Sequence, residues 1–272
     1  METSHFKGRM GPIGGHPGQL QGSGSLDINE HQLYWERYGN DQHPTVLLLH
    51  HGLGSIRSWR RQIPAIVGAG WQALVYDRWG YGRSDERPHF QPEYLASDAE
   101  EAFYLLEALD VKDLALVGHS DGGSIALLMA ADHPARFTAL VVVAAHIYFE
   151  PMMTEGLEQI AQSTLNPVWI EGLRREHGKR AQRLAQTWVE HWRSADSQSL
   201  NMLDRLSTVS CPTLVVQGML DEHATQQHAK DIQQAVQDGQ LWLIPNVKHM
   251  PPHEIPEIFN QRVLEFLAGA ST

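Results

Sequence analysis

The sequence predicts an α/β protein with a mostly parallel central sheet, helices on both faces of the sheet and a helical cap inserted late in the chain. Three observations lead to this fold class. Short aliphatic runs typical of buried strands alternate with segments of helical periodicity. One such run, at residues 114–118, passes through a glycine-rich turn straight into a helical segment. Between residues 151 and 207 the strand signals vanish and only short amphipathic segments remain.

Composition divides the 272 residues into a tail, a core and a cap. Residues 1–25 are rich in Gly, Pro, His and Ser and lack the apolar centre of a secretion signal, so we expect a flexible tail. Residues 26–150 and 208–272 carry the alternating pattern of one α/β core. Residues 151–207 are assigned to the helical cap.

The core elements follow in order along the chain. A β-hairpin opens the core, because residues 26–38 alternate loosely around a turn near Asn29-Glu30. Buried strands are expected at the unbroken apolar runs, which are 44–50, 73–76, 114–118, 137–144, 213–217 and 241–244. Helices are expected at 58–67, 94–109, from 121 onward, 227–236 and 255–267. Strands that alternate with helices imply a parallel sheet covered on both faces.

Charge and composition narrow the possible partners. The formal net charge is −11 and there is no basic run, so neither nucleic acid nor an anionic membrane surface is expected as a partner. No apolar run reaches the roughly eighteen residues of a membrane span. The single cysteine, Cys211, cannot form an internal disulfide, which fits the reducing cytoplasm. We therefore expect a cytoplasmic protein that acts on a small molecule.

Motifs of metal and dinucleotide sites are missing from the chain. It contains no H-E-x-x-H, no paired C-x-x-C and no G-x-G-x-x-G after the first strand. We expect neither a metal ion nor a cofactor.

The strand-to-helix turn at Gly118, Ser120 and Gly122 fits the G-x-S-x-G pattern of a nucleophile elbow. In such an elbow the serine sits in a strained turn, so that its hydroxyl projects from the edge of the sheet. Side chains two residues away would collide with the neighbouring strand and helix, and glycine avoids this. An ordinary glycine-rich turn is the alternative. The His51-Gly52 loop earlier in the chain favours the elbow.

Four features carry a resemblance to a known family: this elbow, the His51-Gly52 loop, and the later segments around Asp221 and His249. With them, the sequence resembles the α/β-hydrolase superfamily over about residues 26–270. The run Gly118-His119-Ser120-Asp121-Gly122-Gly123 is similar to the elbow of biphenyl hydrolase-like proteins, the group that includes valacyclovir hydrolase. Similarity also extends to carbon–carbon bond hydrolases of aromatic degradation and to proline iminopeptidases. The run 77–84 matches the superfamily's D-x-x-G-x-G-x-S turn, which we interpret as structural.

The resemblance implies a catalytic triad in the chain order serine, acid, histidine. A serine hydroxyl is a poor nucleophile near neutral pH, so it needs a base, and the base needs a third group that orients it. Asp221 follows the strand 213–217 at a spacing like the family's G-x-x-D and is the expected acid. Glu222 and Asp204 are the alternative acids, and Asp221 could instead cap the next helix.

His249 is the expected base among 16 histidines, because it lies between the last strand and the last helix. His253 is its competitor. The family usually places glycine before the catalytic histidine, whereas this chain has Lys248, a departure that puts a cation near the site.

Backbone amides are expected to form the oxyanion hole, because a developing negative charge needs donors already in place. The expected pair is the amide of Asp121, after the nucleophile, and that of Leu53, after His51-Gly52. The Leu53 side chain is then free to line an acyl pocket, and His51 is expected to hold its loop in place. Losing one such donor typically costs about 3 kcal/mol of transition-state stabilisation.

Four side chains are candidates for the substrate pocket: His146, Trp169, Trp188 and Trp192. His146 follows a strand at the expected cap entrance, and packing inside the cap is the alternative role for the tryptophans. The valacyclovir hydrolase resemblance also implies that the Asp121 carboxylate attracts a substrate amine. The alternative is that Asp121 caps its helix.

We conclude that the sequence predicts a serine hydrolase acting on a small carboxylic ester through an acyl-enzyme. Carbon–carbon bond hydrolysis and amidase or aminopeptidase activity would use the same triad. A non-catalytic receptor of the same fold, binding a small ligand under the cap, is the alternative from a different class. Dehalogenase and epoxide hydrolase chemistry is disfavoured, because the elbow carries Ser120 instead of an aspartate.

Overall fold

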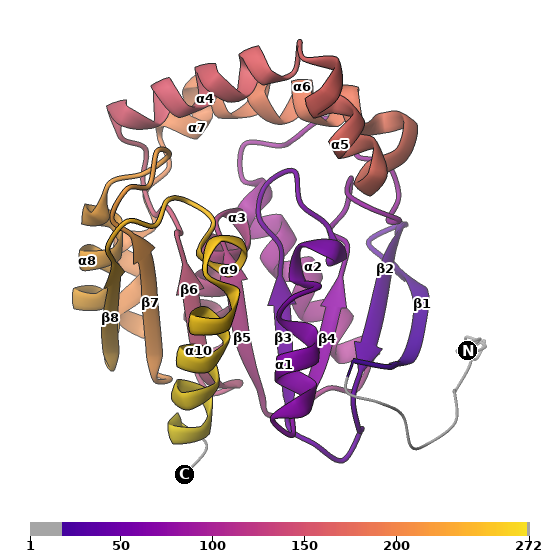
Figure 1. Cartoon of the computed structure of the whole chain (residues 1–272), viewed down its shortest axis with the longest axis vertical. Coiled ribbons are helices and arrows are strands. Elements are labelled where there is room, and N and C mark those ends of the chain that lie inside the picture. Colours follow the sequence, from indigo (N-terminus) through magenta and orange to yellow (C-terminus); the bar gives the residue numbers. More distant parts are fainter. Residues whose placement is uncertain (1–17, 271–272) are drawn as a thin grey trace.

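An eight-stranded sheet in the order β1-β2-β4-β3-β5-β6-β7-β8 forms the centre of the computed structural model, which describes residues 18–270 (Figure 1). β1 and β2 pair antiparallel to each other, and β2 pairs antiparallel to β4. The remaining neighbours are parallel. The strands are β1 Leu20–Ile28, β2 His31–Tyr38, β3 Thr45–Leu49, β4 Gln72–Tyr76, β5 Leu114–His119, β6 Phe137–Val143, β7 Thr213–Gly218 and β8 Gly239–Ile244.

Both faces of the sheet are covered, which explains the unbroken apolar runs. In β3, Val46 and Leu48 join the core under α1 (Ile63–Gly68) and α10 (Pro256–Ala270). Leu47 and Leu49 point the other way, into the core under α2, α3 and α8. Figure 1 shows α1 and α10 in front of the sheet. The helices of the second face are α2 Tyr94–Ala108, α3 Asp121–Asp132 and α8 Gln226–Ala235.

The opening hairpin corrects the boundary of the expected tail. Leu20–Ser25 is part of β1 and pairs along β2, so the expectation of a flexible tail is wrong for these residues. Gly22 and Gly24 lie against the ring of Trp35, where a small residue leaves room for the indole. The hairpin turns at Asn29 and Glu30, whose φ angles of 53° and 69° suit a tight two-residue turn. Residues 1–17 lie outside the described residues.

The expected helix at 58–67 is divided in two. A short 3₁₀ turn spans Ile56–Trp59, and α1 begins only at Ile63. Pro64 has no backbone N–H to donate, so it fits the first turn of a helix but not its interior.

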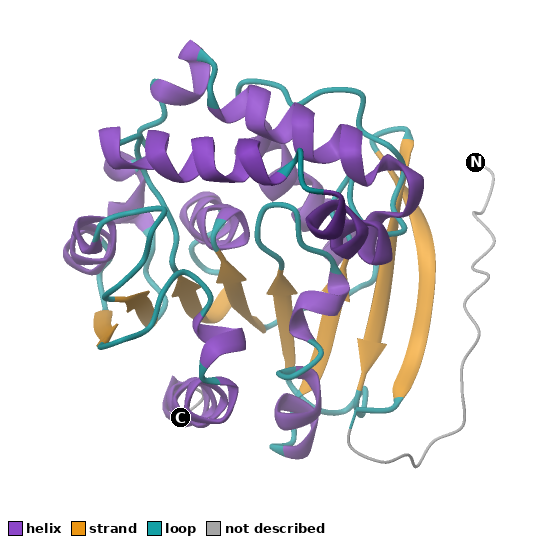
Figure 2. Ribbon diagram, turned by 45° about the horizontal axis from the view of Figure 1, so that its top comes forward, coloured by secondary structure: helices purple, strands orange, loops and turns teal. Residues whose placement is uncertain are grey.

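Four helices lie across the carboxyl ends of the strands, and we call them the upper helical layer (Figures 1 and 2). They are α4 Pro151–Ser163, α5 Pro167–His177, α6 Ala181–Trp192 and α7 Ala195–Gln198. The layer buries the apolar sides of α4 and α6, including Leu157 and Leu184, against the rest of the core. Within residues 18–270, no helix combines the length and the apolar character needed to cross a membrane.

Candidate active site

Ser120 lies between β5 and α3, in the turn that the G-x-S-x-G pattern predicts. Its backbone adopts φ 55° and ψ −121°, a strained conformation for a residue with a side chain. A Cβ at Gly118 would overlap the carbonyl of Gly122, and a Cβ at Gly122 would overlap the carbonyl of Leu49. The two glycines therefore let strand, turn and helix approach closely enough to form the elbow.

His249 brings the three predicted triad side chains together. Its Nε2 lies 3.0 Å from Ser120 Oγ, and its Nδ1 lies 2.8 Å from Asp221 Oδ2. Asp221 follows β7, and His249 lies between β8 and the short helix α9 (Pro251–Glu254). Three segments far apart in the sequence therefore meet at the carboxyl edge of the sheet.

Secondary hydrogen bonds hold this arrangement in place. Asp221 accepts bonds from Gln217 Nε2 at 2.7 Å and from the backbone N–H of His223 at 2.8 Å. His119 Nε2 lies 2.8 Å from the carbonyl oxygen of His249, so this neutral imidazole donates to it. The carboxylate and the imidazole are thus fixed from both sides.

The alternative acids and base occupy other positions. Glu222 accepts the backbone N–H of His249 at 3.3 Å, not its ring. Among the hydrogen bonds of the described residues, none joins Asp204 to His249, and Asp204 lies in the 3₁₀ turn Leu203–Thr208. His253 Nε2 lies 2.8 Å from the carbonyl oxygen of Ser58.

His249 and Asp221 shift each other's pKa values. Burial alone would lower the pKa of His249, but the charge and hydrogen bond of Asp221, together with the charges of Glu222 and Asp121, raise it above the usual histidine value. Burial would raise the pKa of Asp221, but the charge and hydrogen bond of His249 lower it below the usual range. Near neutral pH the Asp221 side chain is therefore an anion, the state that its predicted role as triad acid requires.

Two backbone amides near Ser120 have no acceptor. Within residues 18–270, neither the N–H of Leu53 nor that of Asp121 donates a hydrogen bond. Asp121 is the first residue of α3, where a helix leaves its amides unpaired. Leu53 has φ 60°, and its carbonyl accepts a bond from His177 Nε2 at 2.9 Å, which fixes the loop.

The Asp121 carboxylate is fully buried beside the elbow. Its Oδ2 accepts bonds from Tyr94 Oη at 2.7 Å and from Trp188 Nε1 at 3.1 Å. The side chain therefore does not cap α3, and the capping alternative is wrong. Its Oδ1 has no hydrogen-bond partner among the described residues and lies 3.7 Å from His146 Nε2.

A cavity of about 290 Å³ opens above Ser120, under the upper helical layer. His146, Trp169, Trp188 and Trp192 all line it, together with Leu53. Burial lowers the pKa of His146 to about 4, so this imidazole is neutral near pH 7. The cavity is a mainly apolar chamber with a few polar groups near the serine.

Sequence reasoning missed part of this lining. Met153, Leu157 and Ile160 of α4 reach the cavity, and their helical spacing is the signal that could have identified them. His223, two residues after Asp221, also lines it and meets the His249 ring edge-on at 4.6 Å. Burial lowers the pKa of His223 to about 4.

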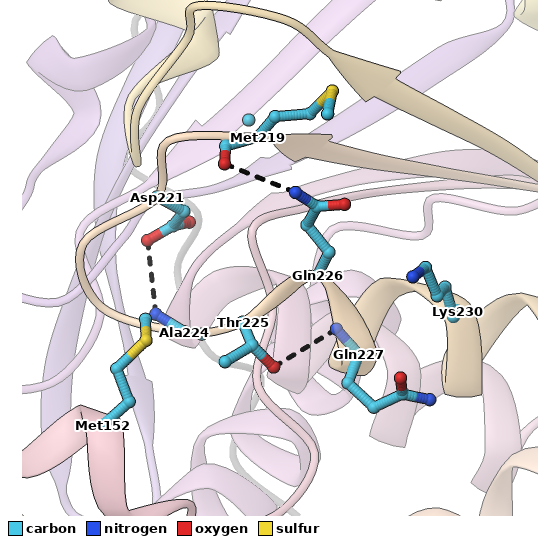
Figure 3. A pocket seen from close by; sticks show the side chains of 9 residues that line it. Met152, Met219, Asp221, Ala224, Thr225, Gln226, Gln227 and Lys230 are labelled. Atoms are coloured by element: carbon cyan, nitrogen blue, oxygen red, sulfur yellow. Dashed lines mark hydrogen bonds between the residues drawn. The ribbon is translucent and has the colours of Figure 1, made fainter.

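A separate hollow of about 400 Å³ borders Asp221 on the side of α8 (Figure 3). Met152, Met219 and Lys230 line it, and neither Ser120 nor His249 does. In Figure 3 a hydrogen bond joins Asp221 to the backbone N–H of Ala224, at 3.3 Å. This hollow therefore lies behind the carboxylate and outside the cavity that Ser120 lines.

Metal-ligating side chains do not gather in the part of the chain that the structure describes. Within residues 18–270 there is no group of three or more His, Cys, Asp or Glu side chains arranged to hold an ion. Cys211 is buried and free, before β7.

Comparison with known proteins identifies the family. The family model described as the alpha/beta hydrolase fold matches residues 44–184. The chain belongs to the α/β-hydrolase family. This α/β-hydrolase is 30% identical to "Serine hydrolase BPHL" of Mus musculus, over 90% of this chain and 86% of the mouse protein. The predicted fold class and the resemblance to biphenyl hydrolase-like serine hydrolases are confirmed.

Other similar proteins are hydrolases of varied kinds. A Pseudomonas sp protein named 2-hydroxy-6-oxononadienedioate/2-hydroxy-6-oxononatrienedioate hydrolase is 25% identical, over 89% of this chain and 95% of that protein. The crystal structure of a membrane phospholipase A superimposes with a TM-score of 0.81 at 20% identity, over 94% of this chain and 88% of that one. The phospholipase likeness concerns the fold alone. Together with the mouse relative, the family identifies this α/β-hydrolase as an enzyme, as predicted.

Proposed function

We propose that Ser120, His249 and Asp221 form a catalytic triad that hydrolyses a small carboxylic ester through an acyl-enzyme. The observation that carries this proposal is the continuous chain of contacts from Asp221 Oδ2 through the His249 ring to Ser120 Oγ. Each of the two contacts is within hydrogen-bond reach, as a nucleophile and its base require.

In the proposed mechanism, His249 Nε2 takes the proton of Ser120 as Oγ attacks the ester carbonyl carbon. The amides of Leu53 and Asp121 donate to the negative oxygen of the tetrahedral intermediate. When the intermediate collapses, His249 returns the proton to the leaving alcohol and the acyl group stays on Oγ. Water, deprotonated by the same imidazole, then attacks the acyl-enzyme and releases the carboxylic acid and free Ser120.

The upper helical layer is proposed to act as the cap of the site, over residues 151–207. Its helices supply most of the apolar lining, including Leu157, Trp169 and Leu173. A mainly apolar chamber of about 290 Å³ under these helices suits a short acyl or aryl group.

The direct test is Ser120→Ala, assayed with p-nitrophenyl acetate and with a fluorophosphonate that labels reactive serines. We expect turnover and labelling to be lost while the circular dichroism spectrum stays that of the wild type. Ser210→Ala is the control, because Ser210 is exposed and precedes β7, at the opposite end of that strand from Asp221. Unchanged ester turnover in Ser120→Ala would overturn the proposal.

Esters or amides of amino acids are a second candidate substrate class. The unpartnered Oδ1 of the buried Asp121 carboxylate is the observation that favours them, since it could accept a bond from a substrate ammonium. Burial would raise the pKa of Asp121, but the Arg78 charge and the hydrogen bonds from Tyr94 and Trp188 lower it, so the group is an anion near pH 7. We expect phenylalanine methyl ester to be preferred over methyl 3-phenylpropanoate, and Asp121→Asn to abolish that preference. An equal ratio in the wild type would exclude this class.

A further inference from the structure

A second cavity lies beyond the wall of the reaction cavity. It measures about 280 Å³ and lies between the end of α6, the start of α2 and the segment 196–205. Its apolar lining includes Leu95, Leu128 and Met202, each nearly inaccessible to solvent. Charged and amide side chains from residues 93 and 196–205 also line it. An apolar floor with polar groups at the edge suits an elongated hydrocarbon chain.

Trp192 is the only residue, among those the structure describes, that lines both cavities. Its indole is 2% exposed and meets the His146 ring edge-on at 4.7 Å on the side of the reaction cavity. It meets the Tyr94 ring edge-on at 6.2 Å, and Tyr94 belongs to the second cavity. One aromatic side chain therefore stands between two chambers of similar size.

The two tryptophans of α6 are held differently. Trp188 donates its indole N–H to Asp121 Oδ2 at 3.1 Å, which ties that ring to the elbow. Trp192, one helical turn later, has no hydrogen-bond partner for its buried N–H within residues 18–270. Only packing contacts keep the Trp192 ring in place, so replacing or turning it breaks no hydrogen bond.

From this geometry we infer that the Trp192 ring separates the two cavities and thereby limits the length of the substrate chain that the enzyme accepts. The second cavity is then a subsite that could hold the far end of a longer apolar chain once the ring is removed. The inference rests on the proposed ester hydrolysis. With the indole in place, the chain of a bound ester ends at the ring. With the indole removed, the same chain continues between Leu95, Leu128 and Met202.

The test compares kcat/KM for p-nitrophenyl acetate, hexanoate and decanoate in the wild type and in Trp192→Ala. Because each buried methylene contributes about fourfold in binding, we expect the decanoate-to-acetate ratio to rise by about tenfold or more. A parallel series of acetate esters of straight-chain alcohols covers the case in which the alcohol part points toward Trp192. Ratios that stay unchanged in both series overturn the inference.

Two further variants separate a joined cavity from a merely larger one. Trp169→Ala widens the reaction cavity at a residue that does not line the second cavity, so we expect a smaller change in the ratio. Adding Leu200→Trp to Trp192→Ala refills the second cavity and should restore the wild-type ratio. An equal gain in Trp169→Ala, or no reversal by Leu200→Trp, would overturn the inference.

Folding and the proposed function are checked in the same experiment. Fluorophosphonate labelling of Ser120 reports an intact site in each variant, and Trp192→Leu replaces Trp192→Ala if the alanine variant does not fold. If the wild type does not hydrolyse the acetate, or Ser120→Ala still does, the ester hydrolysis itself fails. If the wild type hydrolyses it and the ratios do not move, only the role of Trp192 fails.

Discussion

The Arg78 guanidinium lies 3.7 Å from the Asp121 carboxylate, and the same Nη2 donates to the carbonyl oxygen of His51 at 3.2 Å. His51 belongs to the loop that carries Leu53, and Asp121 directly follows Ser120. Arg78 thus connects the two segments whose amides are the proposed oxyanion donors. The guanidinium is almost completely buried and is anchored by Asp98, whose Oδ2 lies 2.8 Å from Nη1. A planar fork with several donors can hold both segments, which a lysine cannot do.

Arg78→Lys is therefore expected to lower kcat for a short ester by about ten- to a hundredfold with little change in KM, since a misplaced oxyanion donor weakens transition-state binding. Steady-state kinetics on p-nitrophenyl acetate measure this effect. Arg87→Lys is the matched control, because Arg87 is buried and also pairs with Asp98, at 2.5 Å, but contacts neither His51 nor Asp121. Equal losses of kcat in the two variants would show that Arg78 supports the fold and has no separate role in positioning the oxyanion donors.

Asp221→Asn is expected to reduce kcat by about ten-thousandfold, the effect seen when a triad carboxylate is replaced by an amide. It should also move the acid limb of the pH–rate profile. Activity needs a neutral His249 and is lost as pH falls through its pKa. Because Asp221 raises that pKa, its removal should shift the acid limb to lower pH.

Glu222→Gln is the control for Asp221→Asn, because Glu222 accepts the backbone N–H of His249 and also contributes charge beside it. We expect a small shift of the acid limb in the same direction and a kcat close to that of the wild type. A larger loss in Glu222→Gln than in Asp221→Asn would make Glu222 the acid of the triad.

The positions of the elbow and of His249 could be predicted because the contacts they make allow few residue types at these places in the sequence. Gly118 and Gly122 leave room for crossing backbone, and a histidine after the last strand can reach a serine at the same sheet edge. The contacts of Asp121 were not predictable in this way. Tyr94 and Trp188, which hold its carboxylate, lie on two helices that no local pattern relates to the elbow.

The strand at residues 20–25 and the position of His223 could not be predicted from the sequence either. Glycine and serine in residues 20–25 resemble a linker, and only the facing Trp35 on β2 explains them as a strand. His223 reaches the cavity because of how its loop packs against α4, where Gly156 leaves room for its ring. In both cases the deciding neighbour lies on a different element, beyond the reach of a local pattern.

Glu101 on α2 is expected to make stability depend on pH. Burial, with the nearby Asp98 charge, raises the pKa of Glu101 to about 8. An unfolded chain would release that proton near the ordinary glutamate pKa of 4.5, so between these values the folded state holds the extra proton. The free energy of unfolding should therefore fall as pH rises from about 4.5 to 8 and level off above that.

Glu101→Gln is the variant that isolates this effect, because glutamine keeps the shape of the protonated acid near His31, 3.2 Å away. Since one pKa unit corresponds to about 1.4 kcal/mol, we expect the variant to gain on the order of 3 to 5 kcal/mol over the wild type by pH 8. Urea unfolding at several pH values measures the difference. A gap between the two proteins that does not widen with pH would contradict the shift.

Gly122→Ala tests whether the elbow depends on close backbone approach. The added Cβ would overlap the carbonyl groups of Leu49 and His50, which are backbone atoms at the end of β3 and cannot turn aside. We expect a loss of about 3 kcal/mol or more in unfolding free energy, together with loss of fluorophosphonate labelling. Gly172→Ala on α5 is the matched control: its Cβ would meet nothing within 4 Å, so the helix should gain about 0.5 to 1 kcal/mol. If Gly122→Ala were as stable and as reactive as the wild type, the glycine would reflect no steric requirement and the geometric basis of the elbow would be lost.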